Sequence, residues 1–227
     1  MPVPDAVLPQ HATLAEVIIT SVEWLFEPYW SGERLIARLD NGRVSLTDSG
    51  GEPAGPEFSE AADELAAAID ADSAVVDGIW TAQPFMGNGG ARQWAETMAE
   101  EGLVDEAPDP ISMETRRAFV AIDLVELEGQ SLADVPYQER RRLLTSLIEE
   151  NVRVRISPAV KLPIHAWLHA WRGHGFTFYV AKHVNSRYRA GEYADDWLIL
   201  SAEPEKGPTI VGRMFGQRPK RLRRIED

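Results

Sequence analysis

The chain of 227 residues has an apolar fraction of 44%, no cysteine and a formal net charge of −13. These values are typical of one large or two small globular domains, and they exclude a disulfide framework and thiolate metal sites. The sequence lacks both a run of about 18 apolar residues and a signal-peptide pattern at its N-terminus, so we expect a cytoplasmic protein with no membrane partner.

The charge is divided unevenly along the chain. Residues 1–110 contain 4 basic and 21 acidic residues, whereas residues 111–227 contain 19 basic and 15 acidic residues. The acidic half disfavours nucleic acid or is simply a solvated surface, whereas a basic tail can contact phosphates. A solubilising terminus is the alternative for the tail. The predicted nucleic-acid contacts are the six cations of that tail: Arg213, Arg218, Lys220, Arg221, Arg223 and Arg224.

The first half of the chain is predicted to be rich in short strands. Asp40-Asn41-Gly42 is a strong hairpin signal, because Asn-Gly tolerates the positive φ angles of a tight turn. Apolar residues at helical spacing indicate one helix. In order, the expected elements are a Pro-rich irregular start, a short helix or strand at 14–20, strands at 22–30, 33–39 and 43–47, a helix at 58–69 and a strand at 73–80.

The second half mixes helices and strands without a regular alternation, which favours an α+β fold over a doubly wound parallel sheet. Its glycine-rich loop lacks the Lys-Ser/Thr pair of a phosphate-binding loop. The expected elements are that loop at 86–90, a polar helix at 91–101, an acidic linker at 106–110, a strand at 117–127, a helix at 132–150 with a break at Pro136, a strand at 152–156, a helix at 163–173, and strands at 176–182 and 196–201.

Residues 24–34 read Trp-Leu-Phe-Glu-Pro-Tyr-Trp-Ser-Gly-Glu-Arg. This stretch resembles the nucleophile motif of ATP-dependent DNA ligases, Phe/Tyr-Glu-x-Lys-x-Asp-Gly-x-Arg, in which the lysine takes the AMP. Glu27, Gly32 and Arg34 keep the register of the motif. Tyr29 stands at the lysine position and Ser31 stands at the aspartate position.

The resemblance covers residues 15–201 and is most specific over 119–144, with further similarity at 175–191 and 196–198. It implies a nucleotidyltransferase core of two antiparallel sheets flanked by helices, with a nucleotide site between the sheets. We therefore expect a ligase adenylation-like domain over 1–201 and a basic tail over 202–227. About 26 residues after Ser201 are too few for the OB-fold domain that usually follows.

The resemblance also implies that several chemical groups of the family are replaced together. The motif Asp-Gly-Glu is present as Asp77-Gly78-Ile79, and Lys182 and Arg34 are retained near the implied site. The replaced positions are Tyr29 for the nucleophile, Ser31 and Ile79 for carboxylates, Ile122 for the adenine-stacking aromatic, Thr177 for the metal-binding glutamate, and Ile199 and Ser201 for two phosphate-binding lysines. Adenylyl transfer needs an amine nucleophile, metal-binding carboxylates and cations on the phosphates.

From these losses we expect a catalytically inactive relative that acts as a binding or accessory protein in DNA repair or end processing. Its expected partners are DNA or a DNA-repair protein. We expect no resident cofactor, with ATP and magnesium bound only if the pocket is still competent, and we interpret Tyr29 as filling the space of the lost lysine. The alternatives are an unusual nucleotidyltransferase that uses Tyr29 or Lys182, and a protein-interaction scaffold with no role at nucleic acid.

One further pattern is formed by histidines that could bind a metal. His165 and His169 are four residues apart on one predicted helix face, and His174 follows. This spacing suits two zinc ligands, but neither a cysteine nor a His-Glu-x-x-His pattern completes the set. The favoured interpretation is a helix that packs Trp167 and Trp171 inward with the histidines at its edge, so no metal site is predicted.

Overall fold

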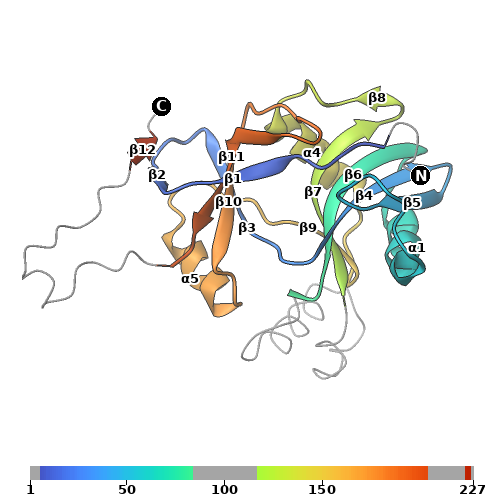
Figure 1. The fold of residues 1–227 in the computed structure, drawn as a ribbon, viewed down its shortest axis with the longest axis horizontal. Coiled ribbons are helices and arrows are strands. Elements are labelled where there is room, and N and C mark those ends of the chain that lie inside the picture. The colour runs from blue at the N-terminus through green and yellow to red at the C-terminus, as the bar shows by residue number, and fades with distance from the viewer. Residues whose placement is uncertain (1–5, 84–116, 204–222, 226–227) are drawn as a thin grey trace, which may run out of the picture.

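The computed structural model describes residues 6–83, 117–203 and 223–225, in which two sheets face each other and helices cover their outer sides (Figure 1). The larger sheet has the order β5-β4-β6-β7-β8, with β9 paired to the other end of β7. Its strands are β4 (Glu33–Asp40), β5 (Arg43–Thr47), β6 (Ser73–Thr81), β7 (Ala118–Leu127), β8 (Gln130–Ser131) and β9 (Val154–Ile156). The smaller sheet has the order β1-β11-β10-β3, with β1 (His11–Leu14), β3 (Trp24–Pro28), β10 (Phe178–His183) and β11 (Tyr193–Ser201).

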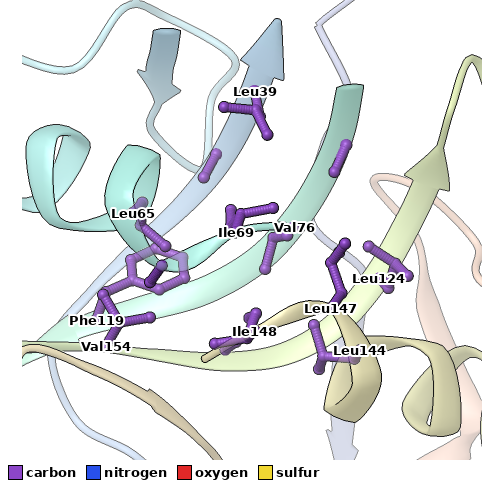
Figure 2. Close-up of a cluster of buried hydrophobic side chains, with 14 of the residues drawn as sticks. Leu39, Leu65, Ile69, Val76, Phe119, Leu124, Leu144, Leu147, Ile148 and Val154 are labelled. Carbon is purple, nitrogen blue, oxygen red and sulfur yellow. The ribbon is translucent and has the colours of Figure 1, made fainter. Parts of the chain in front are cut away.

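Strand alternation explains why each sheet buries both of its faces. On β4, Leu35, Ala37 and Leu39 point into a core shared with helices α1 (Ser59–Ala68) and α4 (Tyr137–Leu147) (Figure 2). Ile36 points the opposite way and packs with Trp197 of the smaller sheet. The outer face of that sheet packs against α5 (His165–Gly173) through a second apolar cluster. The surface between the two sheets is therefore the place where side chains from both can meet.

The expected α+β fold is confirmed, and most of the predicted elements form. Asn41 and Gly42 have φ angles of 48° and 77°, as the hairpin turn requires. The helix expected at 132–150 is shorter, because it starts after Pro136 and ends where Ile148 takes an extended conformation and pairs with Ile69. The sheets are mainly antiparallel, but β1 runs parallel to β11 and β9 runs parallel to β7.

Two of the short strands that the sequence did not predict have partners that are distant in sequence. His11–Leu14, expected to be irregular, forms β1 beside β11. Arg223–Ile225 of the basic tail forms β12, which pairs in parallel with β2 (Val17–Ile19). The loop, helix and linker expected at 86–90, 91–101 and 106–110 lie outside the described residues. Within the described ranges, no helix is long and apolar enough to cross a membrane.

Gly78 lies on β6 at a point where the core leaves no room for a side chain. A Cβ atom added to it would lie 2.2 Å from Cζ of Phe119 and 2.8 Å from the carbonyl oxygen of Val120. We expect Gly78→Ala to lower the free energy of unfolding by about 1–3 kcal/mol, as overpacked cores do. Urea unfolding checks this. The matched control is Gly173→Ala at the end of α5, where a Cβ atom meets nothing within 4 Å; a loss as large as that of Gly78→Ala would contradict the packing argument.

Candidate functional site

A cleft of about 330 Å³ lies between the two sheets. Ile79 and Ile122 line it from the larger sheet, whereas Val180 and Ile199 line it from the smaller sheet. Most of its lining is apolar or aromatic, and the charged side chains that reach it are Glu27, Arg34 and Lys182. The other lining residues are His11, Ala12, Leu14, Pro28, Tyr29, Trp30, Tyr193 and Trp197.

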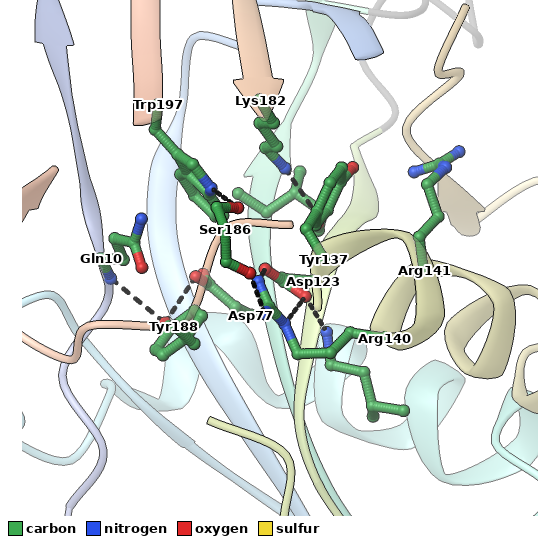
Figure 3. A network of polar contacts seen from close by, with 12 residues as sticks. Gln10, Asp77, Asp123, Tyr137, Arg140, Arg141, Lys182, Ser186, Tyr188 and Trp197 are labelled. Atoms are coloured by element: carbon green, nitrogen blue, oxygen red, sulfur yellow. Dashed lines mark hydrogen bonds and ion pairs between the residues drawn. The ribbon is translucent and has the colours of Figure 1, made fainter. Parts of the chain in front are cut away.

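The innermost polar group of the cleft is an ion pair between Glu27 on β3 and Lys182 on β10. Lys182 Nζ lies 3.0 Å from Glu27 Oε1, and both side chains are 2% exposed. The amine also donates a hydrogen bond to the carbonyl oxygen of Ile122 at 2.8 Å and lies 4.2 Å from the ring centroid of Trp197. Tyr137 of α4 donates its hydroxyl to Glu27. The pair therefore joins both sheets and α4 beneath the cleft. Figure 3 shows Lys182 of β10 beside Tyr137 of α4.

The surroundings of Glu27 favour its ionised form. Burial by itself raises the pKa of the Glu27 carboxyl, but the charges of Lys182 and Arg141 and the hydrogen bond from Tyr137 outweigh it, so the pKa is lowered from its ordinary value of 4.5. Burial lowers the pKa of the Lys182 amine, and the Glu27 charge opposes that change. The neighbouring Arg141 Nη1 lies 3.9 Å from Glu27 Oε1 and donates no hydrogen bond. The buried charges of Glu27, Lys182 and Arg141 therefore compensate one another inside the protein.

A second buried pair lies below the first. Asp123 on β7 accepts two hydrogen bonds from Arg140 of α4, from Nε at 2.9 Å and from Nη2 at 2.7 Å. Both side chains are fully buried. Arg140 Nη1 also donates to the carbonyl oxygens of Val135 and Ser186, at 2.6 and 2.9 Å. This planar, fork-shaped contact fixes α4 and the loop after β10 against the larger sheet.

A third pair fixes the guanidinium that reaches the cleft. Arg34 on β4 donates to Asp77 on β6 from Nε at 2.5 Å and from Nη2 at 2.6 Å. Tyr188 donates its hydroxyl to Asp77 Oδ2 at 2.7 Å, and the backbone N–H of Gln10 donates to the same hydroxyl at 3.2 Å. The Asp77 charge holds the pKa of Arg34 above its usual range despite burial. The Arg34 guanidinium is therefore held rigidly, with its charge neutralised by Asp77.

Residues 9–200 match the family model of the ATP dependent DNA ligase domain. The chain belongs to this family. The match covers most of the chain and includes every strand that builds the cleft, so the family assignment and the expected ligase adenylation-domain fold are both confirmed.

Curated ligase-family proteins resemble the chain over most of its length. The multifunctional non-homologous end joining DNA repair protein LigD of Mycobacterium tuberculosis is 28% identical over 198 residues, which is 84% of this chain and 23% of that protein. A probable DNA ligase of Sorangium cellulosum is 26% identical over 189 residues, which is 82% of this chain and 33% of that protein. The chain thus spans a quarter to a third of the length of these relatives.

Solved ligase structures share the fold. The ligase domain of M. tuberculosis LigD superposes with a TM-score of 0.61 at 24% identity, covering 86% of this chain and 59% of that one. A mycobacterial DNA ligase D complexed with ATP and MES gives a TM-score of 0.59 at 23% identity, covering 86% of this chain and 60% of that one. At this level of identity, the likeness concerns the fold alone.

The structure gathers most of the predicted site residues in one place. Those that line the cleft are Glu27, Tyr29, Arg34, Ile79, Ile122, Lys182 and Ile199. Asp77 is fully buried and supports Arg34. Ser31, Thr177 and Ser201 are exposed and do not line the cleft. Of the predicted nucleic-acid contacts, Arg223 and Arg224 are exposed on β12, whereas Arg213, Arg218, Lys220 and Arg221 lie outside the described residues.

Two interpretations of the sequence need correction. The Tyr29 ring does not fill an interior channel: it is 39% exposed and meets Phe178 edge-on, with ring centroids 6.4 Å apart. Trp167, expected to pack inward on α5, is 46% exposed, whereas Trp171 is buried as expected. His165 and His169 are exposed on α5, and the described part of the chain has no cluster of three or more side chains suited to a metal.

The sequence analysis missed the residues that support the site from α4 and the loop after β10. Arg140 lies three residues after Tyr137 and four before Leu144, both of which are buried. This helical spacing places Arg140 on the buried face of α4, and a buried arginine requires a carboxylate partner. The helical spacing could therefore have predicted that Arg140 is buried and paired with a carboxylate. No local pattern indicates Tyr188 or Gln10, whose contacts with each other and with Asp77 span more than 100 residues.

Proposed function

We propose that this ligase-family domain forms no covalent adduct with AMP and acts by binding at DNA. The observation that carries the proposal concerns the two residues of the cleft that could act as a nucleophile, Tyr29 and Lys182. Tyr29 stands at the nucleophile position, and Lys182, the lysine that lines the cleft, is held between Glu27, the Ile122 carbonyl and two aromatic rings. A lysine nucleophile must be partly neutral and free to attack. Burial lowers the pKa of Lys182, but its ion pair with Glu27 and its hydrogen bond to the Ile122 carbonyl leave the amine not free to attack.

The side chains of the cleft also do not fit a magnesium-bound triphosphate. The carboxylate that lines it, Glu27, is neutralised by Lys182, and Arg34 is neutralised by Asp77. The remaining wall near the smaller sheet is apolar, with Leu14, Val180 and Ile199. Removing phosphate charges from water against such a wall costs free energy without compensating contacts. We therefore derive no step through ATP or a metal.

The DNA partner is proposed from the relatives. The M. tuberculosis relative is described as a multifunctional non-homologous end joining DNA repair protein, and the S. cellulosum relative as a probable DNA ligase. A domain that keeps the fold of such proteins without the reactive groups would keep a role in holding DNA or a repair protein. The basic tail supplies the cations that phosphate contacts need.

Intact-mass spectrometry tests the absence of adenylation. We expect the mass of the purified chain to stay unchanged after incubation with ATP and magnesium, because among the described residues the lysine that lines the cleft is paired with Glu27. Transfer of an adenylyl group with release of pyrophosphate would add about 329 Da. A gain of that size would favour the alternative of an unusual nucleotidyltransferase, and mapping the modified peptide would show whether Tyr29 or Lys182 carries the group.

Electrophoretic mobility of a labelled nicked duplex tests the DNA role. We expect a shift at low salt that weakens steeply as salt rises, because displaced counterions drive phosphate contacts. Replacing Arg213, Arg218, Lys220 and Arg221 by glutamine should weaken the complex without removing β12. The matched control replaces four exposed acidic residues by their amides. Absence of any shift at low salt would favour the scaffold alternative.

A further inference from the structure

A second cavity, distinct from the ligase cleft, lies beside α5. It has a volume of about 250 Å³ and an almost entirely apolar lining. Four aromatic side chains form its walls: Trp30, Trp167, Trp171 and Phe176, together with Pro28, Gln83, Pro158, Ala170 and His174. We call this the α5 aromatic cavity. Trp167 and Trp171 lie one turn apart on the helix, with ring centroids separated by 6.4 Å.

We propose that the α5 aromatic cavity binds an unpaired base of single-stranded nucleic acid. Trp167 carries the argument, because it lines the cavity and is 46% exposed, whereas Trp171 is buried. An exposed tryptophan over an apolar cavity offers a flat surface on which a base can stack. Stacking on aromatic side chains is how proteins hold single strands with little regard to sequence.

The charge around the cavity favours a polyanion over other apolar partners. Residues 151–191 contain no acidic residue and carry seven lysines and arginines. Four of these cations are paired with carboxylates of other segments, namely Arg153, Arg155, Lys182 and Arg189. The other three are Lys161, Arg172 and Arg187. This stretch includes α5 and the lining residues Pro158 to Phe176. Among the described residues, no carboxylate lines the cavity. With Arg172 on α5 and Lys161 shortly before it, this segment repels phosphates less than the acidic first half of the chain does.

The cavity lies next to the ligase cleft. Pro28 and Trp30 line both hollows. Trp30 is held in place because its indole N–H donates to Ser157 Oγ at 3.0 Å and its ring meets Phe176 at right angles, with centroids 4.9 Å apart. The α5 aromatic cavity and the ligase cleft therefore share Trp30 as a common wall.

This inference deepens the proposed binding role and rests on it. The test uses the full chain and a labelled oligothymidylate, with binding followed by fluorescence anisotropy and by quenching of tryptophan emission. We expect Trp167→Ala to weaken binding by about 5- to 100-fold, whereas Trp167→Phe should retain most of the affinity because it keeps an aromatic face. The matched control is Val22→Ala, which shortens a 66% exposed apolar side chain outside the cavity and should leave affinity unchanged.

Competitors distinguish the possible occupants. Unlabelled single strands should displace the probe, whereas blunt duplex of the same length and polyglutamate should displace it poorly. Equal affinity of the wild type and Trp167→Ala would overturn the proposal, and so would displacement by polyglutamate at the same concentration as by single strand, since that result indicates an acidic protein partner. An AMP adduct would refute the proposed function without altering the Trp167 result, so the two failures are distinguishable.

Discussion

Asp123→Ala should lower the free energy of unfolding by about 3–5 kcal/mol, because it leaves the Arg140 guanidinium buried without its counter-charge. Arg140 keeps its hydrogen bonds to two carbonyl oxygens, but these do not neutralise it. Urea unfolding at neutral pH measures the loss. For a protein of this size, each kcal/mol also corresponds to a fall of roughly 2–4 °C in melting temperature.

The control for this prediction is an ion pair of the same chemistry on the surface of the same helix. Arg142 and Glu139 lie three residues apart on α4, with their side chains 67% and 48% exposed. Arg142→Ala should change stability by no more than about 0.5 kcal/mol. Combining Asp123→Ala with Arg140→Met should recover part of the loss, because the second change removes the stranded charge. Similar losses for Asp123→Ala and Arg142→Ala would contradict the account of the buried network.

Glu27→Gln should destabilise the fold by about 3 kcal/mol at pH 7, because Lys182 then stays buried without a carboxylate. The effect depends on pH with a defined sign. The pKa of Glu27 is lowered in the folded protein, so its ionised form contributes stability above the ordinary pKa of 4.5, and that contribution is lost as pH falls through the folded value. The difference in the free energy of unfolding between wild type and Glu27→Gln should therefore be at its full size at pH 7 and become smaller below about pH 4.5.

Urea unfolding of both proteins between pH 7 and pH 3.5 measures this difference. Asp63→Asn, an exposed change on α1, is the matched control and should alter stability by less than about 0.5 kcal/mol at pH 7. If the difference between wild type and Glu27→Gln is the same at pH 7 and pH 3.5, the Glu27 carboxylate is not the stabilising partner of Lys182 that the structure describes.

Much of the fold could be predicted from local sequence patterns. Two of the strands that were not predicted, β1 and β12, pair with residues far away along the chain. The hairpin at Asn41-Gly42 and the helix at Ser59–Ala68 depend on neighbouring residues, so their signals are present in short windows. Strand β1 depends on Tyr193 and strand β12 depends on Val17, partners that lie about 180 and 206 residues away. A strand of three or four residues has too little periodicity to be recognised without its partner.

The same reasoning applies to the site. The resemblance placed Glu27, Arg34 and Lys182 near one another, and the structure brings them to one cleft. It said nothing of the hydroxyl groups that support Glu27 and Asp77, because Tyr137 and Tyr188 reach these carboxylates only through the packing of α4 and the loop after β10. The exposure of Trp167 likewise depends on what covers α5, which helical spacing alone does not specify.

The central claim is that the cleft as a whole, and not only position 29, has lost adenylyl transfer. Intact-mass spectrometry of Tyr29→Lys after incubation with ATP and magnesium tests it most directly, with a lysine-bearing ligase of the family as the positive control. We expect no mass gain, because the new amine would face an apolar wall at Ile199 and charges that are already paired at Glu27 and Arg34. An added mass of about 329 Da on residue 29 would contradict the account.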